Sequence, residues 1–165
     1  MKTVFKSLTN RQGVDLIPYV KEFLANNENT DIYIGCDSQN FRYVTSYAIV
    51  IVLHNPGKGG HVLYSKESVP KIHDKFTRLW SEVEKSIETA EFLRVNDIQR
   101  PAYIDLDLNP DPKYQSNQVL RAALGYVESM GYVPRCKPDS MSASHVADAL
   151  LLDSRVGRLR VLDNL

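Results

Sequence analysis

The chain has 165 residues, of which 43% are hydrophobic and 24% charged, a length and composition that fit one globular domain with its own core. Twenty basic and twenty acidic side chains cancel, so bulk charge does not predict nucleic-acid binding, although a local basic rim around an acidic site is compatible with a zero sum. The polar start MKTVFKSLTNRQ is not a signal peptide, no apolar run approaches the roughly 20 residues of a membrane helix, and two cysteines are too few for a disulfide framework, so we expect a cytoplasmic protein without membrane contact.

The N-terminal half of the chain predicts one helix followed by three strands. Apolar residues fall on one face of NRQGVDLIPYVKEFLANN, and residues 1–28 are therefore interpreted as a helical extension. Strands follow at 31–36, at 42–54 and at 61–69, where β-branched and aromatic residues are frequent. The turn NPGKGG between the last two predicts a hairpin with Lys58 at its tip. Short turns between consecutive strands indicate an antiparallel meander.

The C-terminal half alternates helices and strands. Helical periodicity covers residues 73–94, 116–130 and 142–154, and strands are predicted at 102–108 and 132–137. The order is then β-β-β-α-β-α-β-α, which predicts an α/β fold with a mixed five-stranded sheet. Three antiparallel strands are followed by two strands added through helical crossovers, and helices cover both faces.

This element order is that of the ribonuclease H-like fold, and we expect one such domain over residues 1–165. The tail, residues 154–165, has no predicted element. Because fold alone does not settle function, the chemistry has to come from side chains.

Three carboxylates lie at the ends of two predicted strands. Asp37 directly follows the strand 31–36, and Asp105 and Asp107 share one face of the strand 102–108. If these strands are parallel neighbours, Asp37 and Asp107 meet at the same edge of the sheet. Like charges brought together raise each other's pKa, and a bound Mg²⁺ or Mn²⁺ removes that repulsion. Two such ions about 4 Å apart are suited to phosphodiester hydrolysis.

Two helices offer further acids beside their apolar stripes. Glu82 borders the stripe of the long helix, and Asp148 follows Ala147 in HVADALLL. Each acid has an ordinary structural alternative: Asp37 as a turn carboxylate, Glu82 as a solvated helix charge, and Asp148 as a surface acid. The four acids together, at matching points of one topology, favour a metal site.

Four stretches of the chain resemble a known family. IYIGCDSQ, AIVIVLHNPGKGG, DLDLNPDPKYQSNQVL and GYV…KPDSMSASHVADAL resemble the small bacterial ribonuclease H-like family typified by YkuK, from about residue 5 to about residue 153. The ADAL helix is also similar to the last helix of RuvC-type resolvases, in which an aspartate ligates metal. The resemblance implies two-metal phosphodiester chemistry, with catalytic and metal-binding acids at Asp37, Glu82, Asp107 and Asp148.

The fourth-strand ligand has two candidates. Asp105 shares the face of Asp107, so both are potential metal ligands. The family pattern of an aspartate, one further residue and an asparagine matches Asp107 with Asn109, which favours Asp107.

Basic residues provide candidate contacts to substrate. A basic rim of lysines and Arg78 at the start of the long helix, with Lys137, is suited to a phosphate backbone, although an ordinary charged surface is an equal alternative. For Lys58, in the predicted hairpin, the alternative is an ordinary solvated loop. For His145 the alternative is an ordinary surface histidine. The candidate substrate-binding residues are Lys58, Lys71, Lys75, Lys137 and His145.

Three functional hypotheses result from these residues. The first is a nuclease dependent on Mg²⁺ or Mn²⁺ that cuts RNA, DNA or a hybrid. The second is a ribonuclease H-like module that binds nucleic acid with little or no turnover. The third takes DLD as the metal-nucleotide site of a sugar transferase, and the strand order around it argues against that.

Overall fold

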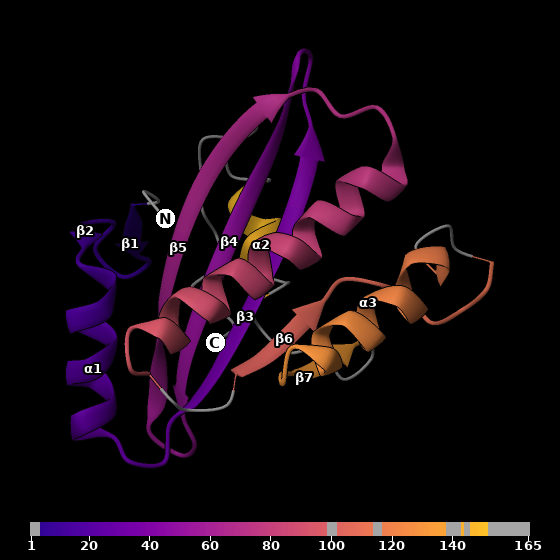
Figure 1. Cartoon of the computed structure of the whole chain (residues 1–165). Coiled ribbons are helices and arrows are strands. Elements are labelled where there is room, and N and C mark those ends of the chain that lie inside the picture. Colours follow the sequence, from indigo (N-terminus) through magenta and orange to yellow (C-terminus); the bar gives the residue numbers. More distant parts are fainter. Residues whose placement is uncertain (1–3, 99–101, 114–116, 138–142, 144–145, 152–165) are drawn as a thin grey trace.

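The protein folds around one mixed sheet, seen in a computed structural model that describes residues 4–98, 102–113, 117–137, 143 and 146–151 (Figure 1). Its seven strands lie in the order β2-β1-β5-β4-β3-β6-β7. In chain order the elements are β1 (Phe5–Ser7), β2 (Gly13–Val14), α1 (Leu16–Asn26), β3 (Asp31–Asn40), β4 (Val44–Asn55), β5 (Gly59–Pro70), α2 (Lys75–Val95), β6 (Ala102–Leu106), α3 (Asn117–Ser129) and β7 (Val133–Cys136).

The central five strands confirm the predicted topology. β3, β4 and β5 form an antiparallel meander. β6 then pairs parallel to β3 after the α2 crossover, and β7 pairs parallel to β6 after α3. The carboxyl ends of β3 and β6 therefore point the same way, as the clustering of their aspartates requires.

The predicted strand count of five is wrong, because the N-terminal segment adds two strands to the sheet edge. Residues 1–28 were expected to form only a helical extension. Instead, β1 pairs antiparallel with β5, and β2 pairs with β1. The physical reason is burial: the Phe5 side chain is 1% exposed in the core, and the helix begins only at Leu16. Periodicity alone does not separate this short hairpin from the helix that follows it.

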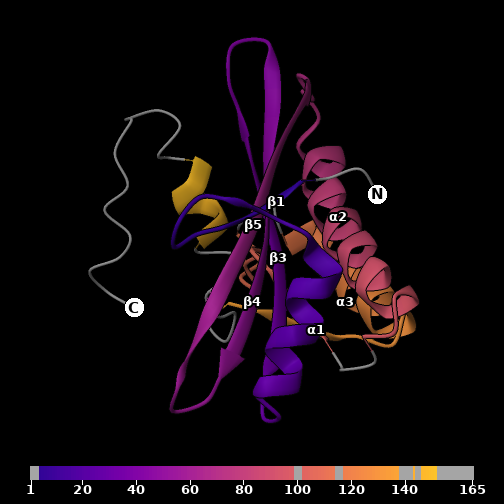
Figure 2. The same cartoon turned by 90° about the vertical axis from the view of Figure 1, so that its left-hand side faces the viewer.

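Helices cover both faces of the sheet, as predicted. α1, α2 and α3 lie on one side, and the helical segment 146–151 lies on the other (Figure 2). Alternation along β3 supplies both cores: Ile32 and Ile34 pack on the α2 side, and Tyr33 packs on the side of residues 146–151. Among the described residues, no helix has the length and apolar character to cross a membrane.

The unequal lengths of β3 and β6 create the open edge where the acids lie. β3 was predicted to end before Asp37, but it continues to Asn40, because its pairing with β4 extends to Asn40 and Thr45. Thr45 Oγ1 donates to Asn40 Oδ1 at 2.5 Å, which holds this end of the hairpin. β6 ends at Leu106, so the last residues of β3 have no strand beside them on that side.

Candidate active site

Asp37, Asp107 and Asp148 gather at the open edge of β3. Gly35 pairs with Asp105, so Asp37 and Asp107, each two residues further, continue side by side past the end of β6. The pKa of Asp37 is raised to about 7, chiefly by burial and also by the nearby charges of Asp107 and Asp148. A backbone hydrogen bond from Ser38 and the charge of Arg78 act in the opposite direction. The three aspartates therefore form an acidic cluster with partly unrelieved charge.

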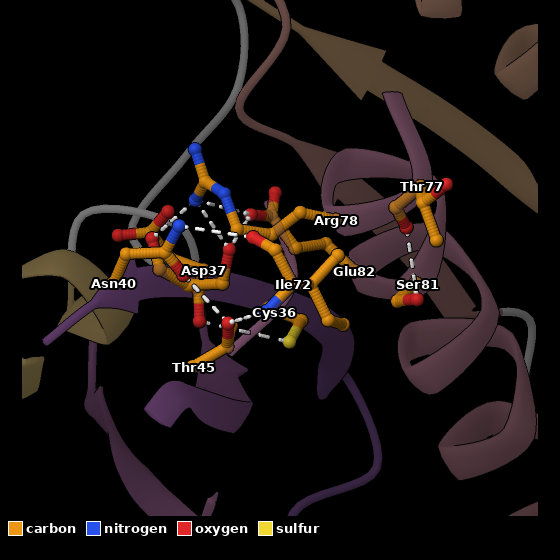
Figure 3. Close-up of polar contacts among 10 residues, drawn as sticks. Cys36, Asp37, Asn40, Thr45, Ile72, Thr77, Arg78, Ser81 and Glu82 are labelled. Carbon is orange, nitrogen blue, oxygen red and sulfur yellow. Dashed lines mark hydrogen bonds and ion pairs between the residues drawn. The ribbon is translucent and has the colours of Figure 1, made fainter. Parts of the chain in front are cut away.

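Glu82 approaches the same edge from α2. Its side chain is buried, with 5% exposed, so the alternative of a solvated helix charge is wrong. Ser38 Oγ donates to Glu82 Oε1, and Arg78 Nη1 lies 3.8 Å from that oxygen. Burial raises the pKa of Glu82 well above its usual range, and Asp37 raises it further. Arg78 and Glu82 both reach from α2 toward Asp37 (Figure 3).

Arg78 and Ser38 connect α2 to β3. Arg78 Nη1 donates to the backbone oxygen of Ser38 at 2.9 Å and to its Oγ at 2.6 Å. Arg78 lies in the first turn of α2, which Asp74 caps by accepting from Thr77 N at 2.7 Å. Sequence reasoning placed Arg78 only in the basic rim and missed Ser38. Two features of the sequence could have identified these residues. Ser38 directly follows Asp37, and Arg78 and Glu82 have the four-residue spacing of an ion pair on one helix.

Asp105 occupies a different environment from Asp107. Its side chain is 1% exposed and accepts a hydrogen bond from the backbone N–H of Ala143 at 3.2 Å. Ala143 belongs to the core on the face of residues 146–151. Asp105 thus ties the C-terminal segment to the sheet, whereas Asp107 lies beyond the strand with its side chain 27% exposed.

Lys137 supplies a positive charge to the acidic cluster. Its Nζ lies 2.5 Å from Asp107 Oδ1. This hydrogen bond raises the pKa of Lys137, and the charges of Asp107, Asp148 and Asp37 act in the same direction. An ammonium group is therefore paired with Asp107 and lies near enough to Asp37 and Asp148 to interact with their charges.

The carboxylates fit a divalent cation by donor chemistry, since Mg²⁺ and Mn²⁺ prefer oxygen ligands. Within the described ranges, no group of three His, Cys, Asp or Glu side chains stands close enough together to hold a metal ion. The contacts of two acids give the reason: Glu82 is turned to Ser38 and Arg78, and Asp107 is paired with Lys137. At this edge the ammonium group of Lys137 supplies the positive charge that a bound metal ion would supply.

The candidate substrate-binding residues fall into separate places. Lys71 lies in the connection between β5 and α2, and Lys75 is the first residue of α2, at the end of the sheet that holds Asp37. Lys58 lies in the turn between β4 and β5, at the opposite end. His145 lies outside the described residues. The predicted basic rim therefore includes Lys71, Lys75 and Lys137 at the acidic edge, and Lys58 is remote from it.

The raised pKa of Asp37 predicts that stability falls as the pH rises. The folded protein holds this proton more tightly than the unfolded chain, whose value is near 3.8, so stability is lost between about pH 4 and about pH 7. Each pKa unit corresponds to about 1.4 kcal/mol. We expect Asp37→Asn to reduce the difference in unfolding free energy between about pH 5 and about pH 8 by about 2 kcal/mol. Urea denaturation with a chelator present measures it.

A matched control for this measurement lies on the same strand. Asp31→Asn changes the same residue type at the opposite end of β3 and leaves the acidic cluster intact. We expect it to keep the wild-type pH dependence. An equal reduction in both variants would show that the effect does not come from the cluster.

Comparisons with known proteins agree with this geometry. The model of a family described as Ribonuclease H-like matches residues 15–150. The chain is 25% identical over 150 residues to the Bacillus subtilis (strain 168) protein named "Uncharacterized protein YkuK", and the match covers 81% of this chain and 87% of that protein. No solved structure matches the chain.

Proposed function

The chain belongs to the ribonuclease H-like family, and from this premise we propose that it is a divalent-metal-dependent nuclease. The carrying observation is that Asp37, Asp107 and Asp148 lie near enough at the open edge of β3 to interact electrostatically, and that Asp107 is paired there with Lys137. The proposed substrate is a phosphodiester of RNA, DNA or a hybrid, and the proposed cation is Mg²⁺ or Mn²⁺. The resemblance of the chain to ribonuclease H-like proteins supports both.

The proposed ligands are Asp37, Glu82, Asp107 and Asp148. When bound, a divalent cation stabilises the charge that develops on the phosphate and lowers the pKa of water. Asp37, on β3, and Asp107, directly after β6, would fix the position of the positive charge. Ser38 and Arg78 hold the Glu82 carboxylate toward β3. Lys137, whose side chain is 45% exposed, is free to contact a phosphate once Asp107 has another cation.

A basic and aromatic surface beside the acids supports a nucleic-acid substrate. At the tip of the β3–β4 hairpin, Tyr43 is 83% exposed and Arg42 is exposed. The backbone N–H of Lys71 donates to the Tyr43 carbonyl at 3.0 Å, so the tip and the lysines before α2 form one surface. Exposed aromatic rings stack on bases, and lysines and arginines contact phosphates.

A substrate panel tests the proposed function. Single and double strands of RNA and DNA, a hybrid and a four-way junction are incubated with wild type and with Asp37→Asn, in Mg²⁺, Mn²⁺ or Ca²⁺. We expect cleavage of at least one substrate by wild type with Mg²⁺ or Mn²⁺, none with Ca²⁺, and a rate that falls as salt rises. If wild type cuts nothing faster than the variant does, the nuclease proposal is wrong.

A second candidate function is a nucleic-acid-binding module with little turnover. Arg78 and Lys137 already neutralise part of the acidic cluster, which favours this alternative. It predicts salt-dependent binding of the same substrates without cleavage, and binding that Asp37→Asn leaves unchanged.

A further inference from the structure

A pocket of about 440 Å³ lies between α1 and the β4–β5 hairpin. Both elements are at the lower left of Figure 1. Its volume falls in the range of small-molecule sites. We propose that this pocket binds a nucleobase carrying an exocyclic amino group, presented by a free nucleotide or by an unpaired position of a strand. The lining residues used below are Tyr19, Glu22, Phe23, Asn26, Lys58 and His61.

Three rings provide the flat surfaces that a base requires. The Phe23 and His61 ring centroids lie 4.6 Å apart, and those of Tyr19 and His61 lie 5.9 Å apart. A 2.6 Å hydrogen bond between Tyr19 Oη and His61 Nδ1 fixes the histidine ring across the pocket. His61 is exposed and Phe23 is half-buried, so both retain ring surface for a ligand. Stacking on such rings is tolerant of base identity.

Hydrogen-bond acceptors provide the selectivity for an amino group. One amide N–H of Asn26 donates to the Glu22 carbonyl at 2.9 Å, and its Oδ1 is an acceptor. The Glu22 carboxylate lies one helical turn before it and also lines the pocket. These residues belong to the last two turns of α1, where the helix dipole is negative. Amino groups of adenine, cytosine or guanine suit this wall, whereas uracil offers it only the N3–H, which lies between two carbonyl oxygens that the acceptors disfavour.

Lys58 supplies a cation on the opposite wall. It lies in the hairpin turn, where its backbone N–H donates to the Asn55 carbonyl at 2.9 Å. The neighbouring Gly59 has a φ of +85°, and a Cβ at this position would meet no atom within 4 Å, so the backbone leaves open space beside the lysine. The phosphate of a nucleotide whose base is bound in the pocket would reach this ammonium group.

The pocket is physically separate from the acidic cluster. Asp37 pairs with Ala48, and His54 pairs with Gly60 at the pocket. Six residues of β4 separate these points, which corresponds to about 20 Å of strand. The inference goes beyond the proposed nuclease activity and does not require it, since the pocket contacts a base rather than the scissile phosphate.

Nuclear magnetic resonance in chelator tests the site without any metal. ¹⁵N-labelled protein is titrated with AMP, CMP, GMP and UMP, and the amides of Lys58, Gly59 and Gly60 are the reporters. We expect saturable shifts with the three amino-bearing nucleotides and at least about fivefold weaker binding of UMP, because its N3–H is flanked by two carbonyl oxygens that face the acceptors of this wall. Single-stranded oligonucleotides of A, C and U form the second arm. Shifts with strands alone would identify a strand position as the source of the base.

Variants distinguish binding in the pocket from a general effect of protein charge. Lys58→Gln should weaken AMP about fivefold and leave adenosine unchanged, and Glu22→Gln should reduce the preference for AMP over UMP. Lys113→Gln, an exposed lysine in a distant loop, should have neither effect. The proposal is overturned if neither nucleotides nor strands shift the reporters, or if Lys113→Gln matches Lys58→Gln. Asp37→Asn should bind AMP as wild type does, so failure of the nuclease proposal leaves this result intact.

Discussion

Asp107→Ala is expected to lower the cleavage rate by about 100-fold or more with little change in stability, and Asp105→Ala is expected to do the reverse. Asp107 is half-buried, and its partner in the structure is the exposed Lys137, so its removal costs the fold about 1 kcal/mol at most. Asp105 accepts from the buried N–H of Ala143. Loss of that acceptor should lower the unfolding free energy by about 2 kcal/mol.

Each variant serves as the control for the other. Both remove an aspartate from the same short segment, so any general effect of charge appears in both. Cleavage is measured per folded molecule, with the folded fraction taken from urea denaturation, and Mn²⁺ affinity comes from calorimetric titration. Equal losses of Mn²⁺ affinity, or the larger loss in Asp105→Ala, would place the metal ligand two residues earlier than we propose.

Arg78→Ala is expected to lower the unfolding free energy by about 3 kcal/mol at about pH 8, because it leaves Glu82 buried without its cation. The pKa of Glu82 is already raised by burial, and Arg78 opposes that shift. Without Arg78 the pKa of Glu82 rises further, so the carboxyl takes up its proton at a higher pH than it does beside Arg78. The destabilisation should therefore shrink toward about pH 5. Urea denaturation at both pH values measures the change.

A second substitution shows whether Glu82 is the cause. In Arg78→Ala with Glu82→Gln, no buried charge remains to be neutralised, so most of the pH-dependent loss should disappear. Arg121→Ala, an exposed arginine on α3, should change stability by less than about 0.5 kcal/mol. A loss that is independent of pH, and that Glu82→Gln does not reduce, would instead trace the effect to the two hydrogen bonds from Arg78 to Ser38.

Local sequence patterns were sufficient for the central fold. Strand composition and short turns predicted the β3–β5 meander, and helical periodicity predicted the crossovers that make β6 and β7 parallel neighbours. Patterns failed at the N-terminus, where β1 and β2 have three and two residues. Segments this short carry no periodicity, and their pairing with β5 depends on the buried position of Phe5.

The sequence by itself was sufficient to predict that Asp37 and Asp107 lie at one edge of the sheet, because alternate residues share a face and parallel strands share a carboxyl end. Only the tertiary structure decided their environments. It buried Glu82 against Ser38 and Arg78, tied Asp105 to Ala143, and left Asp107 beyond β6 with Lys137. It also showed that Lys58 lies at the end of the sheet opposite to the acids. Burial and charge partners come from residues distant in the chain, and such contacts exist only after the sheet and helices have packed.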